Sequence, residues 1–100
     1  MRSRWDREIP ALLDVAQVLR ETDGVTVAQE IHEILGRVSE LVKRTGARAY
    51  EPHLLEQRAR LARLVGERAT FERQLGEAHR LYIEMGATGH AERLERELGL

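Results

Sequence analysis

The fold of this chain is decided by residues 69–98, ATFERQLGEAHRLYIEMGATGHAERLEREL. Apolar residues recur in its first half at steps of four, three, four and three, namely Phe71, Leu75, Ala78, Tyr82 and Met85. This spacing places them on one stripe of an α-helix, while the charged residues between them point elsewhere. The break Gly86-Ala87-Thr88-Gly89 ends the helix, and a short closing helix follows. An amphipathic helix cannot bury its stripe alone, so the upstream chain must supply partners.

Three further helices are predicted upstream of this stretch, each followed by a glycine that can end it. The first runs from Pro10, in its first turn, to about Arg20, and the second from an N-cap at Thr26, with Gln29 closing a capping box, to Gly46. The third runs from Pro52 to Gly66, with an inner face of Leu54, Leu61, Ala62 and Val65. Thr88 is the expected cap of the closing helix. Because no segment alternates like a strand, we expect an all-α protein of about five helices.

Part of the chain repeats. Thr45-Gly46-Ala47 recurs as Met85-Gly86-Ala87 at an offset of 40 residues, and Leu12-Leu13-Asp14 recurs as Leu54-Leu55-Glu56 at an offset of 42. Paired helices repeated at such a period are typical of an α-solenoid, in which each pair buries its surface on the next. The sequence therefore predicts antiparallel helix pairs stacked as a short α-solenoid over residues 8–100, with a C-terminal capping helix, after a flexible segment of residues 1–7.

Three runs carry a family resemblance: GARAYEP at 46–52, EQRARLARL at 56–64 and EAHRLYIEMGATGHAERL at 77–94. They resemble the last repeats of tetratricopeptide (TPR) arms at the C-termini of bacterial class III adenylate or guanylate cyclase-like proteins. Related ATP-binding signalling and transcriptional regulators carry similar arms. The resemblance covers about residues 8–99 and implies a TPR-like interaction module in signalling. The chain has no glycine-rich phosphate loop ending in Lys-Ser or Lys-Thr, so a cyclase or ATPase label does not transfer to it.

Composition narrows the classes of function. The chain has sixteen basic residues, fifteen of them arginine, and seventeen acidic residues. The net charge of −1 gives no overall attraction to nucleic acid or to a membrane surface. There is no cysteine, which excludes disulfides and thiol chemistry. No run approaches the roughly 18 apolar residues of a membrane span, and the start of the sequence lacks an apolar signal segment. We expect a cytoplasmic protein that binds neither membrane nor nucleic acid.

Catalytic and metal-binding residues are not expected. The four histidines are His32, His53, His79 and His90, and each falls on a different predicted helix or cap, so a zinc or hydrolytic site would form only if folding gathered them. Thr26, Thr70 and Thr88 are better explained as helix caps than as nucleophiles. We therefore predict a non-enzymatic chain without a cofactor or a metal.

Arg58 interrupts the predicted inner face of the third helix. A charge placed between Leu54, Leu61 and Val65 needs a partner, and a salt bridge or hydrogen bonds to a neighbouring helix is the favoured reading. The alternative is that Arg58 faces a ligand.

A candidate partner-binding surface lies on the opposite face of the same helix. The TPR resemblance implies that the first helix of each pair lines a concave surface, and here that surface would carry His53, Gln57, Arg60 and Arg63, with Glu56 among them. An acidic peptide or another domain could dock there through arginine–carboxylate contacts. The alternative is a solvated face. Binding of nucleic acid through Arg58, Arg60, Arg63 and Arg68 is disfavoured, because Glu56 and Glu67 interleave with them and no aromatic residue accompanies them.

The first helix is apolar on two sides, so one side is left for another molecule. We expect Trp5, Ala11, Val15 and Val18 to form an oligomer interface, most simply in a symmetric dimer. The predicted function is thus a non-catalytic protein–protein interaction module, either self-associating or the terminal arm of a signalling protein. The alternative is a small-ligand sensor or an enzyme with a pocket between its helices.

Overall fold

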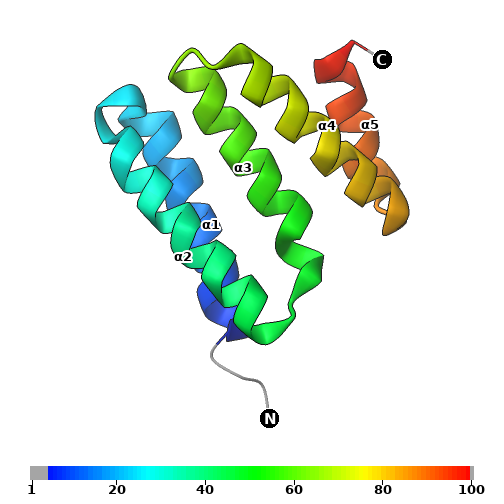
Figure 1. Cartoon of the computed structure of the whole chain (residues 1–100), viewed down its shortest axis with the longest axis horizontal. Helices are drawn as coiled ribbons and strands as arrows, with labels where there is room; N and C mark the ends of the chain where they lie inside the picture. Colours follow the sequence, from blue (N-terminus) through cyan, green and yellow to red (C-terminus); the bar gives the residue numbers. More distant parts are fainter. Residues whose placement is uncertain (1–4, 100) are drawn as a thin grey trace.

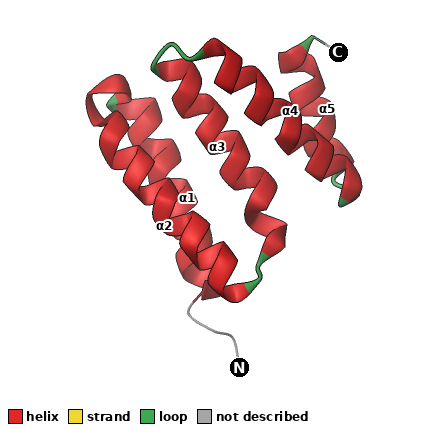
Figure 2. Cartoon of the chain, viewed as in Figure 1, coloured by secondary structure: helices red, strands yellow, loops and turns green. Residues whose placement is uncertain are grey.

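A computed structural model describes the backbone of residues 5–99 and the side chains of residues 7–99. It contains α1 (Trp5–Thr22), α2 (Ala28–Thr45), α3 (Glu51–Leu64), α4 (Arg68–Glu84) and α5 (Thr88–Leu98). Short 3₁₀ turns at Gly24–Val27 and Arg48–Tyr50 precede α2 and α3. The described residues form no strand (Figure 2). The predicted all-α class with five helices is confirmed. None of the helices within residues 5–99 is long and apolar enough to cross a lipid bilayer.

Consecutive helices pack against each other as antiparallel neighbours (Figure 1). In that view α2 lies in front of α1 and α4 in front of α5, while α3 lies between the two pairs and α1 also contacts α3. The molecule is flat, with extents of 42 × 35 × 19 Å. Two helical hairpins, α1–α2 and α3–α4, are thus stacked side by side and closed by α5, as the repeat predicts.

The turn after α3 and the turn after α4 have the same hydrogen bonds. The amide of Glu67 donates to the carbonyl of Ala62, and the amide of Ala87 donates to the carbonyl of Tyr82, each at 2.8 Å. Each pair spans the glycine of a Schellman turn, and Gly86 has a φ of 75° that L-residues with a side chain rarely adopt. The same turn is thus used at the end of both helices.

The apolar core forms two clusters that meet at α3. The first joins α1, α2 and the start of α3 through Ile9, Leu13, Ala16, Ile31, Leu35, Val38, Leu41, Val42 and Leu54. The second joins α3, α4 and α5 through Ala59, Ala62, Phe71, Leu75, Ala78, Tyr82, Ala91 and Leu94. The predicted stripe of α4 is therefore buried, except for Met85, which lies past the end of the helix and is 48% exposed.

Several local predictions were wrong. Pro10, predicted in the first turn of the first helix, lies further inside α1, which begins at Trp5, and there it cannot donate the usual backbone hydrogen bond. Residues 1–4 of the segment predicted to be flexible lie outside the described residues, so its flexibility stays a prediction. The hydroxyl of Thr26 donates to the carbonyl of Asp23 at 2.7 Å, because the chain forms a 3₁₀ turn there, and so it does not cap α2. Thr88 is the first residue of α5, after the N-cap Ala87.

Candidate functional site

A polar groove of about 630 Å³ runs along the side of the molecule formed by α1, α3 and α5. These are the first helices of the two hairpins and the closing helix. Every side chain that lines the groove is polar or charged: Gln17, Arg20, Glu21, His53, Glu56, Gln57, Arg60, His90, Arg93 and Glu97. Apolar stripes turn each helix toward the two core clusters, so the remaining polar faces of three helices converge here.

Glu56 is the buried charge at the centre of the groove, with a residue exposure of 7%. Its carboxylate accepts two hydrogen bonds from the Arg93 guanidinium, at 2.8 and 2.9 Å, and others from Arg60 and from the hydroxyl of Tyr82, both at 3.1 Å. Burial alone would raise the pKa of Glu56, but the hydrogen bonds and charges of Arg93 and Arg60 outweigh it and lower the pKa to about 2. Glu56 is therefore ionised at any physiological pH.

A second arginine–carboxylate pair runs in the opposite direction between the same helices. Arg60 of α3 donates to both carboxylate oxygens of Glu97 of α5, at 2.7 and 2.6 Å. The hydrogen bonds from Arg60 lower the pKa of Glu97 and raise that of Arg60. Arg93–Glu56 and Arg60–Glu97 are thus two bidentate salt bridges that hold the closing helix α5 against α3.

Rings pack beside this ion cluster. The ring of Tyr82 stacks on that of His90 with centroids 4.7 Å apart, and the His53 ring meets both rings edge-on. Burial, and then the neighbouring His90, lower the pKa of His53, so this ring is neutral at pH 7. Because the Tyr82 hydroxyl donates to Glu56, the Nδ1–H of His53 donates to the Tyr82 oxygen, at 2.9 Å.

Arg20 of α1 is the arginine of the groove that is most weakly paired with carboxylates. Its side chain is 17% exposed, and its closest carboxylate within the described chain is that of Glu21, 3.9 Å away. Its Nε is buried and has no hydrogen-bond partner among residues 7–99. Burial, followed by the positive charge of Arg60, lowers the pKa of Arg20. An anion that entered the groove could thus bind Arg20, which the fold leaves incompletely paired.

The structure brings together part of the predicted partner surface. His53, Gln57 and Arg60 line the groove, whereas Arg63 lies at its edge, 55% exposed, with its guanidinium over the Phe71 ring. Arg60 is only 10% exposed and is occupied by Glu97 and Glu56. It therefore holds the fold together instead of presenting a free cation.

The prediction that Arg58 is a buried and paired charge was wrong. Arg58 is only partly buried, and no hydrogen bond or ion pair joins it to any other described residue. The buried charge of α3 is instead Glu56, which was predicted on the candidate partner-binding face, opposite Arg58.

The predicted oligomer surface is partly described. Val15 is 46% exposed and Val18 is 55% exposed, and Ala11 on the same helix is exposed as well. The side chain of Trp5 lies outside the described residues. Whether this surface is an interface between copies stays a prediction.

Sequence reasoning missed Arg20 and Arg93. A signal for Arg20 exists, because Ile9, Leu13, Ala16 and Arg20 follow one another at helical spacing and the first three are buried. Arg93 has no such signal, because its role depends on the docking of α5 against α3. In residues 7–99, no group of three or more histidines and carboxylates is arranged to hold a metal ion.

Comparisons with protein-family models, with curated proteins and with solved structures give no significant match for this chain.

Proposed function

We propose that the chain is a non-catalytic, TPR-like protein-interaction module that receives an acidic segment of a partner protein in the groove between α1, α3 and α5. The observation that carries the proposal is Arg20, a mostly buried cation with a Nε that no described side chain or backbone group satisfies. A carboxylate from a partner would supply the missing charge and hydrogen-bond acceptor.

The groove is suited to such a ligand because its floor is already ordered. Glu56, Arg60, Arg93 and Glu97 neutralise one another within the fold, so they need not rearrange when a partner binds. Preorganised groups lose little conformational entropy on binding. Around this neutral floor Gln17, Gln57, His53 and His90 offer polar contacts to a peptide backbone.

The chemistry of the groove supports binding better than catalysis. A general acid needs a pKa near the working pH, whereas Glu56 is held as an anion by two arginines with a pKa of about 2. The neutral His53 is occupied by the Tyr82 hydroxyl. We therefore propose a cytoplasmic binding module, in keeping with the TPR arms of signalling proteins.

The proposal is tested by fluorescence anisotropy with a labelled, C-terminally amidated hexapeptide that carries three glutamates. We expect binding that weakens with added salt, because the attraction is electrostatic. Arg20→Gln should weaken it by about 10-fold, the cost of one charge-assisted contact. The matched control is Arg68→Gln, since Arg68 is 85% exposed on α4 and away from the groove.

Equal loss of affinity in the Arg20 and Arg68 variants would show that peptide binding depends only on the net charge of the protein, and it would overturn the proposed site. Binding of a glutamine-for-glutamate peptide as tight as that of the acidic peptide would also contradict it.

Self-association through α1 is a second part of the proposal. The exposed valines Val15 and Val18 form, with Ala11, an apolar strip at the open end of the helix stack. A second copy could cover that strip in a symmetric dimer.

A further inference from the structure

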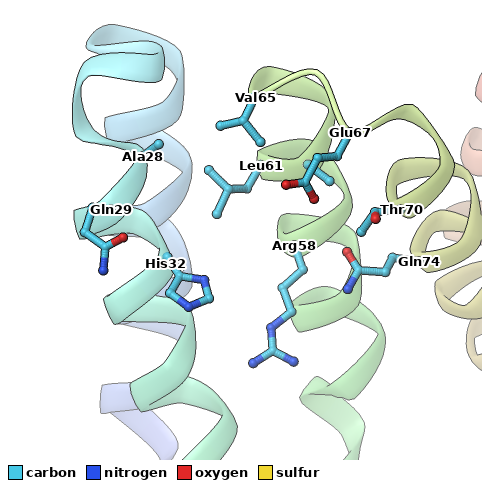
Figure 3. A pocket seen from close by; sticks show the side chains of 10 residues that line it. Ala28, Gln29, His32, Arg58, Leu61, Val65, Glu67, Thr70 and Gln74 are labelled. Atoms are coloured by element: carbon cyan, nitrogen blue, oxygen red, sulfur yellow. The ribbon is translucent and has the colours of Figure 1, made fainter.

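A second cavity, of about 510 Å³, lies between α2, α3 and α4 (Figure 3). It is lined by Ala28, Gln29, His32, Arg58, Leu61, Ala62, Val65, Glu67, Thr70 and Gln74. Leu61 packs against the first core cluster and Ala62 belongs to the second, so the cavity lies where the two clusters part. Its wall thus combines an apolar part, formed by Ala28, Leu61, Ala62 and Val65, with polar and charged side chains, and Val65 is 42% exposed there.

Arg58 lines this cavity and has no partner among the described residues. Its side chain extends from α3 into the gap that faces α2 (Figure 3), and within residues 7–99 no carboxylate or carbonyl bonds to its guanidinium. A guanidinium has five N–H donors and no acceptor. The group it can pair with best is a carboxylate, which accepts two parallel hydrogen bonds.

Gln74 is a second side chain of this cavity with an unsatisfied hydrogen-bonding group. Its side chain extends from α4 toward Arg58 (Figure 3), and its Oε1 is buried without a hydrogen-bond partner in the described chain. The terminal amide torsion of glutamine is soft, so the oxygen can turn toward the cavity at little cost. It would then accept a hydrogen bond from an N–H of the ligand.

Together, we propose that this cavity binds a carboxylate that carries an adjacent amide N–H and a compact aliphatic side chain, as in an N-acylated amino acid or the C-terminal residue of a peptide. The carboxylate pairs with Arg58, the amide N–H donates to Gln74, and the aliphatic group covers Leu61 and Val65. The site lies on the other side of α3 from the proposed peptide groove and is independent of it.

Two other titratable groups line the cavity. His32 of α2 lies across from Arg58, and Glu67 stands in the turn between α3 and α4, with its carboxylate directed toward the cavity (Figure 3). Glu67 is exposed and forms no ion pair with the described residues. Its negative charge opposes an incoming carboxylate, so Glu67→Gln should tighten binding by about 2-fold.

The test is a titration of the whole chain, labelled with ¹⁵N, with N-acetyl-leucine followed by NMR. We expect a dissociation constant on the order of 1 mM, typical of so small a ligand, with shifts confined to residues around the cavity. Arg58→Gln should weaken binding by about 10-fold, and N-acetyl-leucinamide, which lacks the carboxylate, should lose as much. The ligand 4-methylpentanoate, which lacks the N–H, should lose about 3-fold.

Gln74→Leu separates a ligand contact from a structural role. It removes a buried oxygen that has no partner in the described chain, so the variant should melt at the same temperature as the wild type or higher, yet bind N-acetyl-leucine more weakly by about 3-fold. A longer peptide ending in leucine distinguishes the two sources of the ligand: tighter binding identifies a polypeptide C-terminus, and equal binding a free acylated amino acid.

Equal binding of the acid and the amide, or an Arg58→Gln variant with wild-type affinity and wild-type melting temperature, would overturn the inference. The acidic hexapeptide should bind the Arg58 variant normally, so that failure at this cavity leaves the proposed groove untouched, and the reverse also holds.

Discussion

Replacing Glu56 by glutamine tests the ion cluster that closes the helix stack. The change keeps the shape of the side chain but removes the charge that Arg93 and Arg60 share. The fall in the Glu56 pKa from 4.5 to about 2, at about 1.36 kcal/mol per unit, corresponds to about 3 kcal/mol of stability at pH 7. Because Arg93 still reaches water, we expect a loss of about 2–3 kcal/mol.

The stabilisation that Glu56 provides should depend on pH. A carboxylate with a depressed pKa in the folded state stabilises the fold above its unfolded pKa, and this stability is lost as the pH falls through the folded pKa. The contribution of Glu56 should therefore be complete at pH 7, fall to about half at pH 3 and vanish below pH 2. The glutamine variant cannot titrate at this position, so the gap between variant and wild type should narrow on acidification.

Urea unfolding followed by circular dichroism at pH 7 and pH 3 measures this gap. In thermal melts at pH 7 the expected loss appears as a fall of about 10–20 °C. The control is Glu72→Gln, because Glu72 forms only an exposed pair with Arg68 and should cost less than about 0.5 kcal/mol. A Glu56 variant as stable as the wild type at pH 7, or a loss of the same size at both pH values, would refute the reasoning.

Three further predictions concern the core, a turn and the apolar strip. Leu75→Ala, at a fully buried position, should cost about 2–5 kcal/mol in urea unfolding, and a loss under 1 kcal/mol would contradict the packing of α4. Gly86→Ala should cost about 1 kcal/mol in the same measurement, because its φ of 75° strains alanine, and an unchanged midpoint would argue against the turn. In light scattering the wild type should be a dimer and the double variant Val15→Glu, Val18→Glu a folded monomer, whereas a monomeric wild type at high concentration would remove the proposed interface.

The helices could be predicted from the sequence because their signals are local. The stripe of Phe71, Leu75, Ala78 and Tyr82 needs only the period of a helix, and the glycines that end helices carry their own conformational signal. The helix starts were less predictable. Thr26 has the right residue type for a cap, but a 3₁₀ turn places its hydroxyl on the carbonyl of Asp23.

The groove was only partly predictable, because its charges depend on which helices meet. A helical wheel places Glu56 near the polar face of α3, and nothing local indicates that Arg93 of the closing helix will cover it. Arg58, in contrast, lies beside Leu61 and Ala62 as predicted, but no residue of a neighbouring helix pairs with it among the described residues, and it lines a cavity instead. Contacts between residues far apart in the sequence thus determined which charge became buried.

Binding of an acidic segment in the groove between α1, α3 and α5 is tested most directly by an NMR titration of the ¹⁵N-labelled chain with the amidated, glutamate-bearing hexapeptide. We expect shifts to gather on α1, α3 and α5 around Arg20, Gln57 and His90, and Arg20→Gln to remove them. Shifts centred on the exposed faces of α2 and α4, or shifts around the groove that persist in the Arg20 variant, would contradict it.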